Sequence, residues 1–170
     1  MQSQALSAKK TPVVTQVSLD DLFKRMSEWS NRIAKRAYDF FAASGFTNGH
    51  DLEDWFKAER ELLKPVALEV KEAPDEFIIK VEMPGFNAHD LNIEVNGSHV
   101  IVESSHETHE DKHGKEQTIQ TERSCAQIYR SIELPTPVRA DTAKADFKDG
   151  VLELKLPKAE KAKLTKIAAA

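Results

Sequence analysis

The sequence predicts a mainly β protein, an immunoglobulin-like antiparallel β-sandwich preceded by an α-helical hairpin. After Pro65, apolar residues alternate with polar ones in several short runs, which is the period of half-buried strands. Asn96-Gly97 and Asp149-Gly150 join two pairs of these runs with the chemistry of tight hairpin turns. Before Pro65, apolar residues recur every three or four positions instead, which is the period of a helix.

The N-terminal part is predicted to be a flexible tail over 1–17 and a helical module over 18–64. Residues 1–17 show no periodicity. Ser18 and Asp21 match the Ser-x-x-Asp cap that opens a helix, and Ser44-Gly45 can close it. A second helix is expected from about 51 to 63, because Lys64 precedes a proline and such residues avoid helical angles. Two amphipathic helices with this short connection can pack as a hairpin.

The second half of the chain is predicted to form the sandwich over 65–157, with a flexible tail over 158–170. Alternating apolar runs lie at 66–70, 77–83, 91–95, 128–134 and 152–156. Short strands at this spacing, separated by turn residues, are typical of an antiparallel sandwich.

Composition excludes several classes of function. The net charge of −4 in 170 residues argues against a nucleic-acid partner, because phosphate binding needs a basic face. No run approaches the ~18 apolar residues that a membrane span needs, and the first residues lack the apolar core of a signal peptide. We therefore expect a cytoplasmic protein with no nucleic-acid or membrane partner.

No enzyme site and no cofactor are expected. The sequence has neither a Gly-x-x-x-x-Gly-Lys phosphate loop nor a Gly-x-Ser-x-Gly nucleophile elbow. A charged loop carries His106, His109 and His113, and it is read either as solvated or as a weak metal site. We assign no metal, because nothing in the sequence indicates a rigid frame for these ligands. Cys125 is either a small apolar filler or a thiol that could bridge to another chain.

The last hairpin carries a recognisable signature. Ala145 followed by Asp149-Gly150-Val151-Leu152 resembles the A-x-x-x-n-G-V-L motif of bacterial-type small heat-shock proteins, the α-crystallin-domain family. Met83-Pro84-Gly85 matches a Pro-Gly that this family places after its second strand. The resemblance implies an ATP-independent chaperone, a holdase that binds partly unfolded proteins and prevents their aggregation under stress.

A second resemblance covers the helical module. The stretch 33–63 is similar to a small bacterial helical module of unassigned function. The residues that carry this likeness are Gly49, Asp51, Leu52, Trp55, Ala58, Glu59 and Leu62. The likeness implies a shape but no activity.

The family resemblance also implies a homodimer formed by strand exchange. The donated strand would comprise Thr118, Ile119, Gln120, Thr121 and Glu122. Arg130 matches a family arginine at the dimer contact, and it is read either as an interface ion pair or as a strand-end side chain reaching water. Many members end in Ile-x-Ile, whereas this chain has Leu164 and Ile167 three apart. We therefore expect a free dimer or small, labile oligomers.

The client-binding surface is expected mainly on the helical module. Eight of the twelve aromatic residues lie in 1–64, where they either fill the interior of the hairpin or hold unfolding chains. The candidate residues are Leu19, Leu22, Phe23, Met26, Trp29, Phe40, Phe41, Trp55 and Phe56, with a second surface at Ile93 and Val95. The alternatives are a single-partner adaptor or co-chaperone without general holdase activity and, more remotely, a metal-dependent enzyme using the histidine loop.

Overall fold

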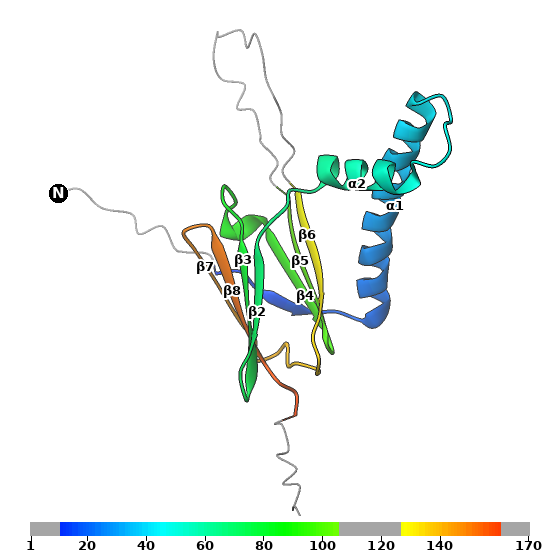
Figure 1. Ribbon diagram of the computed structural model, residues 1–170. Helices are drawn as coiled ribbons and strands as arrows, with labels where there is room; N and C mark the ends of the chain where they lie inside the picture. Colours follow the sequence, from blue (N-terminus) through cyan, green and yellow to red (C-terminus); the bar gives the residue numbers. More distant parts are fainter. Residues whose placement is uncertain (1–10, 106–126, 161–170) are drawn as a thin grey trace, which may run out of the picture.

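The structure, a computed structural model, describes residues 11–105 and 127–160 (Figure 1). One of its two sheets contains β2 (Leu68–Glu72), β3 (Glu76–Glu82), β7 (Lys144–Lys148) and β8 (Val151–Pro157). These strands lie in the order β2-β3-β8-β7, and every neighbouring pair is antiparallel.

The second sheet contains β1 (Val14–Gln16), β4 (Leu91–Asn96), β5 (His99–Ser105) and β6 (Gln127–Glu133). Its order is β1-β4-β5-β6, with β1 parallel to β4 and the other pairs antiparallel. A short 3-10 helix, η1 (Ala88–Asp90), leads into β4. Two four-stranded sheets facing each other confirm the predicted sandwich.

The core lies between the two sheets and follows the alternation in the sequence. Leu152, Leu154 and Leu156 of β8 are fully buried, while Glu153 and Lys155 between them face outward. The opposite sheet contributes side chains such as Ile93 and Val102. Burying each side chain of this size contributes about 1.5–3 kcal/mol, so this core is the main source of stability.

The β7–β8 hairpin has the predicted tight turn. Asp149 and Gly150 both have positive φ angles, 51° and 77°, as a type I′ turn requires. A Cβ at position 150 would also lie 3.3 Å from Cα of Pro84, so glycine fits this close approach. In the β4–β5 hairpin, Asn96 pairs with His99, which places the turn at Gly97-Ser98, one residue later than predicted.

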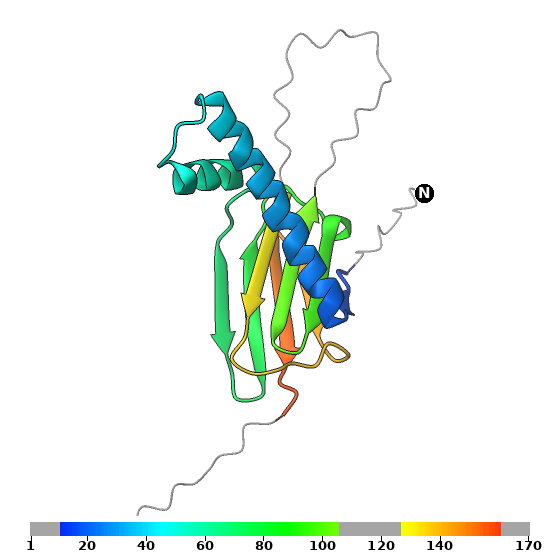
Figure 2. The same cartoon turned by 90° about the vertical axis from the view of Figure 1, so that its right-hand side faces the viewer.

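The two predicted helices are α1 (Leu19–Ala43) and α2 (Asp51–Leu62). The Ser18 hydroxyl accepts a hydrogen bond from the Asp21 backbone N–H at 3.1 Å, which confirms the predicted cap. Helix α1 crosses the outer face of the β4-β5-β6 part of its sheet, and α2 folds back on the end of α1 (Figure 2). Among the described helices, none is both long and apolar enough to span a membrane.

The expectation that residues 1–17 form a tail is wrong for Val14–Gln16. This segment is β1, and the Val17 N–H donates to the Val95 carbonyl at 3.1 Å. The Asn96 side-chain amide also donates to the Val17 carbonyl, at 2.8 Å. A three-residue strand is too short to show a period, and its partner lies far away in the sequence. Residues 1–10 lie outside the described residues.

Candidate functional site

Helix α1 covers an apolar patch on the outside of the sandwich. Ile101 points away from the sandwich core, because its neighbours Val100 and Val102 point into it, yet Ile101 is fully buried. The face of α1 turned toward this sheet contains Leu22, Trp29 and Ile33, all buried. The structure therefore has a second, smaller apolar interface between helix and sheet.

Charged groups lie within this helix–sheet interface. Arg25 Nη2 lies 3.3 Å from Glu94 Oε1, and Arg25 Nε lies 3.5 Å from Glu103 Oε2. Glu94 is only 8% exposed. Burial alone would lower the pKa of Arg25, but the carboxylates of Glu103 and Glu94 outweigh this effect and raise that pKa above its ordinary value. The guanidinium thus stabilises two carboxylates beneath the helix.

Aromatic contacts complete the interface. Trp29 Nε1–H donates to Glu103 Oε1 at 3.2 Å, and the rings of Trp29 and Tyr129 lie 5.3 Å apart. The Tyr129 hydroxyl oxygen is buried and has no hydrogen-bond partner among the described residues. Burial is the main cause that raises the pKa of the Tyr129 phenol above its ordinary value. Apolar, ionic and aromatic contacts together fix α1 on the sheet.

The structure divides the predicted client-binding residues into three groups. Leu22 and Trp29 belong to α1 and are buried between this helix and the sheet. They cannot contact another chain while the helix lies on the sheet. Leu19, Phe23 and Phe56 are each about half exposed, at 46–50%. The remaining helical candidates are partly buried, and they are Met26, Phe40, Phe41 and Trp55.

The second predicted client surface is not available. Ile93 and Val95 are at most 1% exposed, because both point into the sandwich core. The strand edge that carries them is paired with β1. The expectation of an uncovered apolar edge at this position is therefore wrong, and the physical reason is the strand that the sequence did not reveal.

Three exposed apolar side chains were missed by the sequence reasoning. Tyr38, Phe46 and Leu52 are 59–72% exposed, and all three belong to the helical module. Phe46 lies in the connection between the helices, where a large apolar residue is itself a signal. Leu52 is the most exposed of the three, although its spacing from Trp55 and Phe56 suits a shared helical face.

The β2 edge is the open side of the sandwich. Leu68 and Val70 pair with the core residues Val81 and Ile79, so they lie on the same inner face of the sheet. They remain 37% and 43% exposed, and all five residues of β2 are exposed. An edge strand with uncovered apolar side chains can receive another strand.

The predicted dimer residues are only partly described. Residues 118–122 lie outside the described residues, as do the three histidines of the 106–114 loop and Cys125. Arg130 is exposed, and its Nη2–H donates to the Val66 carbonyl at 2.9 Å. Among the described residues it forms no ion pair, so the carboxylate expected across an interface stays a prediction.

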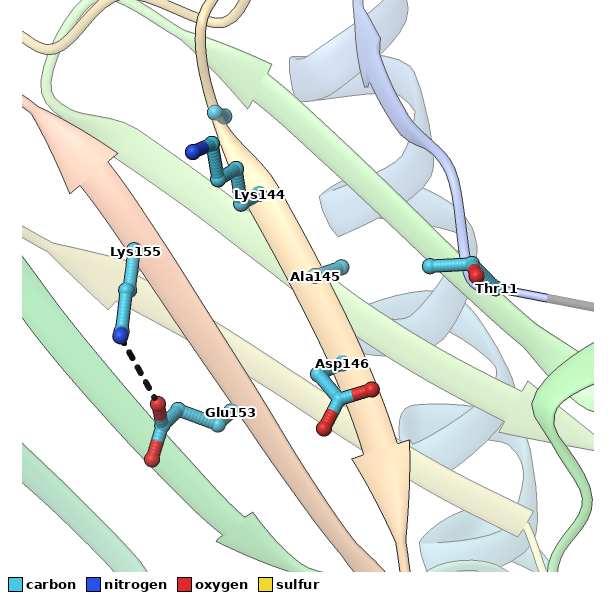
Figure 3. A pocket seen from close by; sticks show the side chains of 7 residues that line it. Thr11, Lys144, Ala145, Asp146, Glu153 and Lys155 are labelled. Atoms are coloured by element: carbon cyan, nitrogen blue, oxygen red, sulfur yellow. Dashed lines mark ion pairs between the residues drawn. The ribbon is translucent and has the colours of Figure 1, made fainter. Parts of the chain in front are cut away.

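A hollow of about 530 Å³ lies beside β7 and β8 (Figure 3). Its charged side chains are Lys144, Asp146, Glu153 and Lys155, and Lys155 Nζ lies 3.5 Å from Glu153 Oε1. Lys80 also lies 3.3 Å from Glu153, so this carboxylate already has two cations. Within 11–105 and 127–160, no cluster of three or more His, Cys, Asp or Glu is arranged for a metal. We assign no ligand to this hollow.

Comparisons with known proteins cover both parts of the chain. Residues 69–168 match the Hsp20/alpha crystallin family, and residues 28–64 match a family described as "Protein of unknown function (DUF2934)". The chain is similar to the 16.9 kDa class I heat shock protein 3 of Oryza sativa subsp. japonica, with 32% identity over 90 residues. That match covers 53% of this chain and 60% of the relative.

Two further proteins are similar to this chain. Spore protein SP21 of Stigmatella aurantiaca is 36% identical over 92 residues, covering 54% of each protein. Heat shock protein 16.0 from Schizosaccharomyces pombe has a solved structure with a TM-score of 0.48 and 24% identity, covering 63% of this chain and 98% of that one. The chain spans 54–60% of the length of the curated relatives named here.

Proposed function

Because the chain belongs to the Hsp20/alpha crystallin family, we propose that it is an ATP-independent holdase that binds partly unfolded proteins and prevents their aggregation under stress. Family membership implies a chaperone and not an enzyme. The holdase proposal rests on a set of apolar side chains that the helical module leaves uncovered. They are Leu19, Phe23, Tyr38, Phe46, Leu52 and Phe56, and they are called the uncovered set below.

The free energies of burial and of association favour several weak contacts over one strong site. Burying one such side chain contributes about 1.5–3 kcal/mol, whereas association costs about 4–15 kcal/mol. A single exposed phenylalanine therefore holds nothing. The uncovered set, doubled in a dimer, can hold an unfolding chain weakly and with little sequence preference, which suits a holdase.

We further propose that the protein is a homodimer in which residues 118–122 of each subunit pair with β2 of the other. The uncovered Leu68 and Val70 support β2 as the receiving edge. The incoming strand would supply backbone hydrogen bonds to the edge and cover these two side chains.

The test of the holdase is light scattering of a heated client protein in the presence of the full chain. Replacing Leu19, Phe23 and Phe56 together by serine should raise the amount of chaperone needed for protection several-fold. The control replaces the exposed Lys24, Glu53 and Lys57 of the same helices by serine and should protect like the wild type.

Two outcomes would contradict the proposal. Equal protection by the Leu19, Phe23 and Phe56 variant would remove the helical module from client binding. Absence of protection by the wild type with several unrelated clients would favour the single-partner adaptor. Point substitutions are preferable to deleting the helices, because deletion would uncover Ile101 and create a new apolar surface.

A further inference from the structure

A small cavity lies where the helical module meets the sandwich. It has a volume of about 180 Å³ and is formed by the end of α2, the linker that follows it and β6. The Lys64 N–H donates to the Gln127 carbonyl at 2.7 Å, which holds this linker beside the start of β6 (Figure 1). Junctions between two parts of a protein are frequent places for ligand sites. The charged side chains of the lining are Glu59, Arg60, Lys64 and Arg130.

The three cations of this cavity are held in place without being neutralised. Within the part of the chain that the structure describes, none of them forms an ion pair. Arg130 Nη2–H donates to the Val66 carbonyl at 2.9 Å, and Lys64 Nζ donates to the Pro84 carbonyl at 3.3 Å. A backbone carbonyl positions a cation but leaves its full charge. Because Glu59 is the single anion of the lining, the cavity carries a net charge of +2, which favours a dianion.

The chemistry of the lining selects a phosphate group with an organic substituent. A phosphate monoester carries a charge of about −1.5 to −2 at pH 7, which matches the charge of the cavity. Guanidinium groups bind two phosphate oxygens at once, and lysine adds a point charge. The rest of the lining is Leu63, Pro65 and Tyr129, so one side of the cavity is mostly apolar and suits the substituent.

We propose that this cavity binds the phosphate group of a small phosphorylated compound. Arg60 and Lys64 belong to the stretch 28–64 that matches one family, and Arg130 belongs to the stretch 69–168 that matches the other. The site therefore exists only where the helical module and the sandwich are joined in one chain. A bound phosphate would contact α2, the linker and β6 together, and so stabilise the module on the sandwich.

This site goes beyond the proposed holdase and is independent of it. No residue of the uncovered set lines the cavity, so phosphate binding and client binding can fail separately. Arg130 is also the arginine expected at the dimer contact. A carboxylate of the partner on Arg130 would compete with phosphate, so the two interpretations of Arg130 give opposite results in the test.

The test is isothermal titration calorimetry of the full chain with phenyl phosphate and with inorganic phosphate, at constant ionic strength. Phenyl phosphate should bind saturably to a single site per chain, with a dissociation constant of about 1 mM or lower. Inorganic phosphate should bind several-fold more weakly, because it leaves Leu63 and Pro65 uncovered. Equal affinities would support the anion site and assign it to free phosphate. Benzenesulfonate, which has the same ring but one charge, should bind at least about threefold more weakly than phenyl phosphate.

Substitutions of opposite expected sign make the test specific. Arg60→Gln and Lys64→Gln should each weaken the binding of phenyl phosphate about three- to fivefold. The matched control is Lys148→Gln, which removes an exposed lysine that does not line the cavity, and its affinity should stay within about 1.5-fold of the wild type. Glu59→Gln should strengthen binding about twofold, because it removes the single negative charge of the lining.

Three results would overturn the proposal. Phenyl phosphate could show no saturable binding up to about 10 mM. Lys148→Gln could weaken binding as much as Lys64→Gln does, or Glu59→Gln could fail to strengthen it. Absence of binding in a chain that sedimentation equilibrium shows to be dimeric would assign Arg130 to the interface instead.

Discussion

Arg25 lies between Glu94 and Glu103 where α1 meets the sheet, so its charge decides how well the helix is held. We predict that Arg25→Met lowers the free energy of unfolding by about 1–3 kcal/mol, because it leaves two carboxylates without their cation. The loss should stay below that of a fully buried pair, because the Arg25 side chain is 37% exposed. Urea denaturation measures it.

The matched control for Arg25 is Arg36→Met in the same helix. Arg36 pairs with Glu61 at 2.7 Å, but that pair is exposed. Removing this ion pair should lower the free energy of unfolding by less than about 1 kcal/mol. Equal losses for the two variants would show that the carboxylates beneath α1 do not depend on Arg25.

Tyr129 gives the helix–sheet interface a pH dependence at the alkaline end. Its pKa is raised in the folded protein, chiefly by burial, so the neutral phenol is favoured. The stability from this group is fully present below the unfolded-state pKa, about 10. It is lost as the pH rises through the higher folded-state pKa. We predict that Tyr129→Phe removes this alkaline loss in the free energy of unfolding, measured by denaturation from about pH 9 to 11.

The exposed Tyr38 provides the control for Tyr129, because the two substitutions delete the same hydroxyl group. Tyr38→Phe should keep the alkaline pH dependence of the wild type. If both variants keep it, the buried phenol does not contribute to the titration of stability.

At the scale of elements, the short strand β1 covers the β4 edge of its sheet, although only three residues of β1 pair with β4. We predict that Val17→Pro speeds amide exchange in residues 93–96 by about 3- to 10-fold, because it deletes the hydrogen bond from Val17 N–H to the Val95 carbonyl. Hydrogen–deuterium exchange measures this change. Val13→Pro, just before β1, is the control and should leave β4 protected, whereas equal exchange rates for both variants would mean that β1 does not protect β4.

At the scale of the whole molecule, the open β2 edge predicts the state of association. Replacing Leu68 and Val70 by lysine should weaken the dimer at least about tenfold, because charged side chains on an edge oppose strand addition. Sedimentation equilibrium measures the dissociation constant. The control, Glu69→Gln with Lys71→Gln, changes polar residues of the same strand and should leave the dimer intact. A monomeric wild type would contradict strand exchange and favour the single-partner adaptor.

Much of the fold could be read from local sequence patterns. The alternation at Leu152, Leu154 and Leu156 fixes which face of β8 is buried, and Asp149-Gly150 fixes where the chain turns. Ser18 marks the start of α1 because a cap is a contact within one helical turn. The family could be inferred in the same way, since its signature lies within a single hairpin.

The candidate surface was less predictable than the fold. Periodicity showed that α1 has an apolar stripe, but it could not show that Leu22 and Trp29 lie against the sheet while Phe23 stays half exposed. Ile101 gave no signal, because an apolar residue on an outward face becomes buried only when another element covers it.

The amino-acid sequence by itself determined the two helices, the described strands other than β1, the β7–β8 turn and the family, because each depends on residues a few positions apart. The tertiary structure decided where α1 lies, which strand covers β4 and which apolar side chains stay in water. Those outcomes depend on contacts such as Arg25 with Glu94, which are 69 positions apart in the chain. Such a pairing is selected by the packing of whole elements, and no local pattern encodes it.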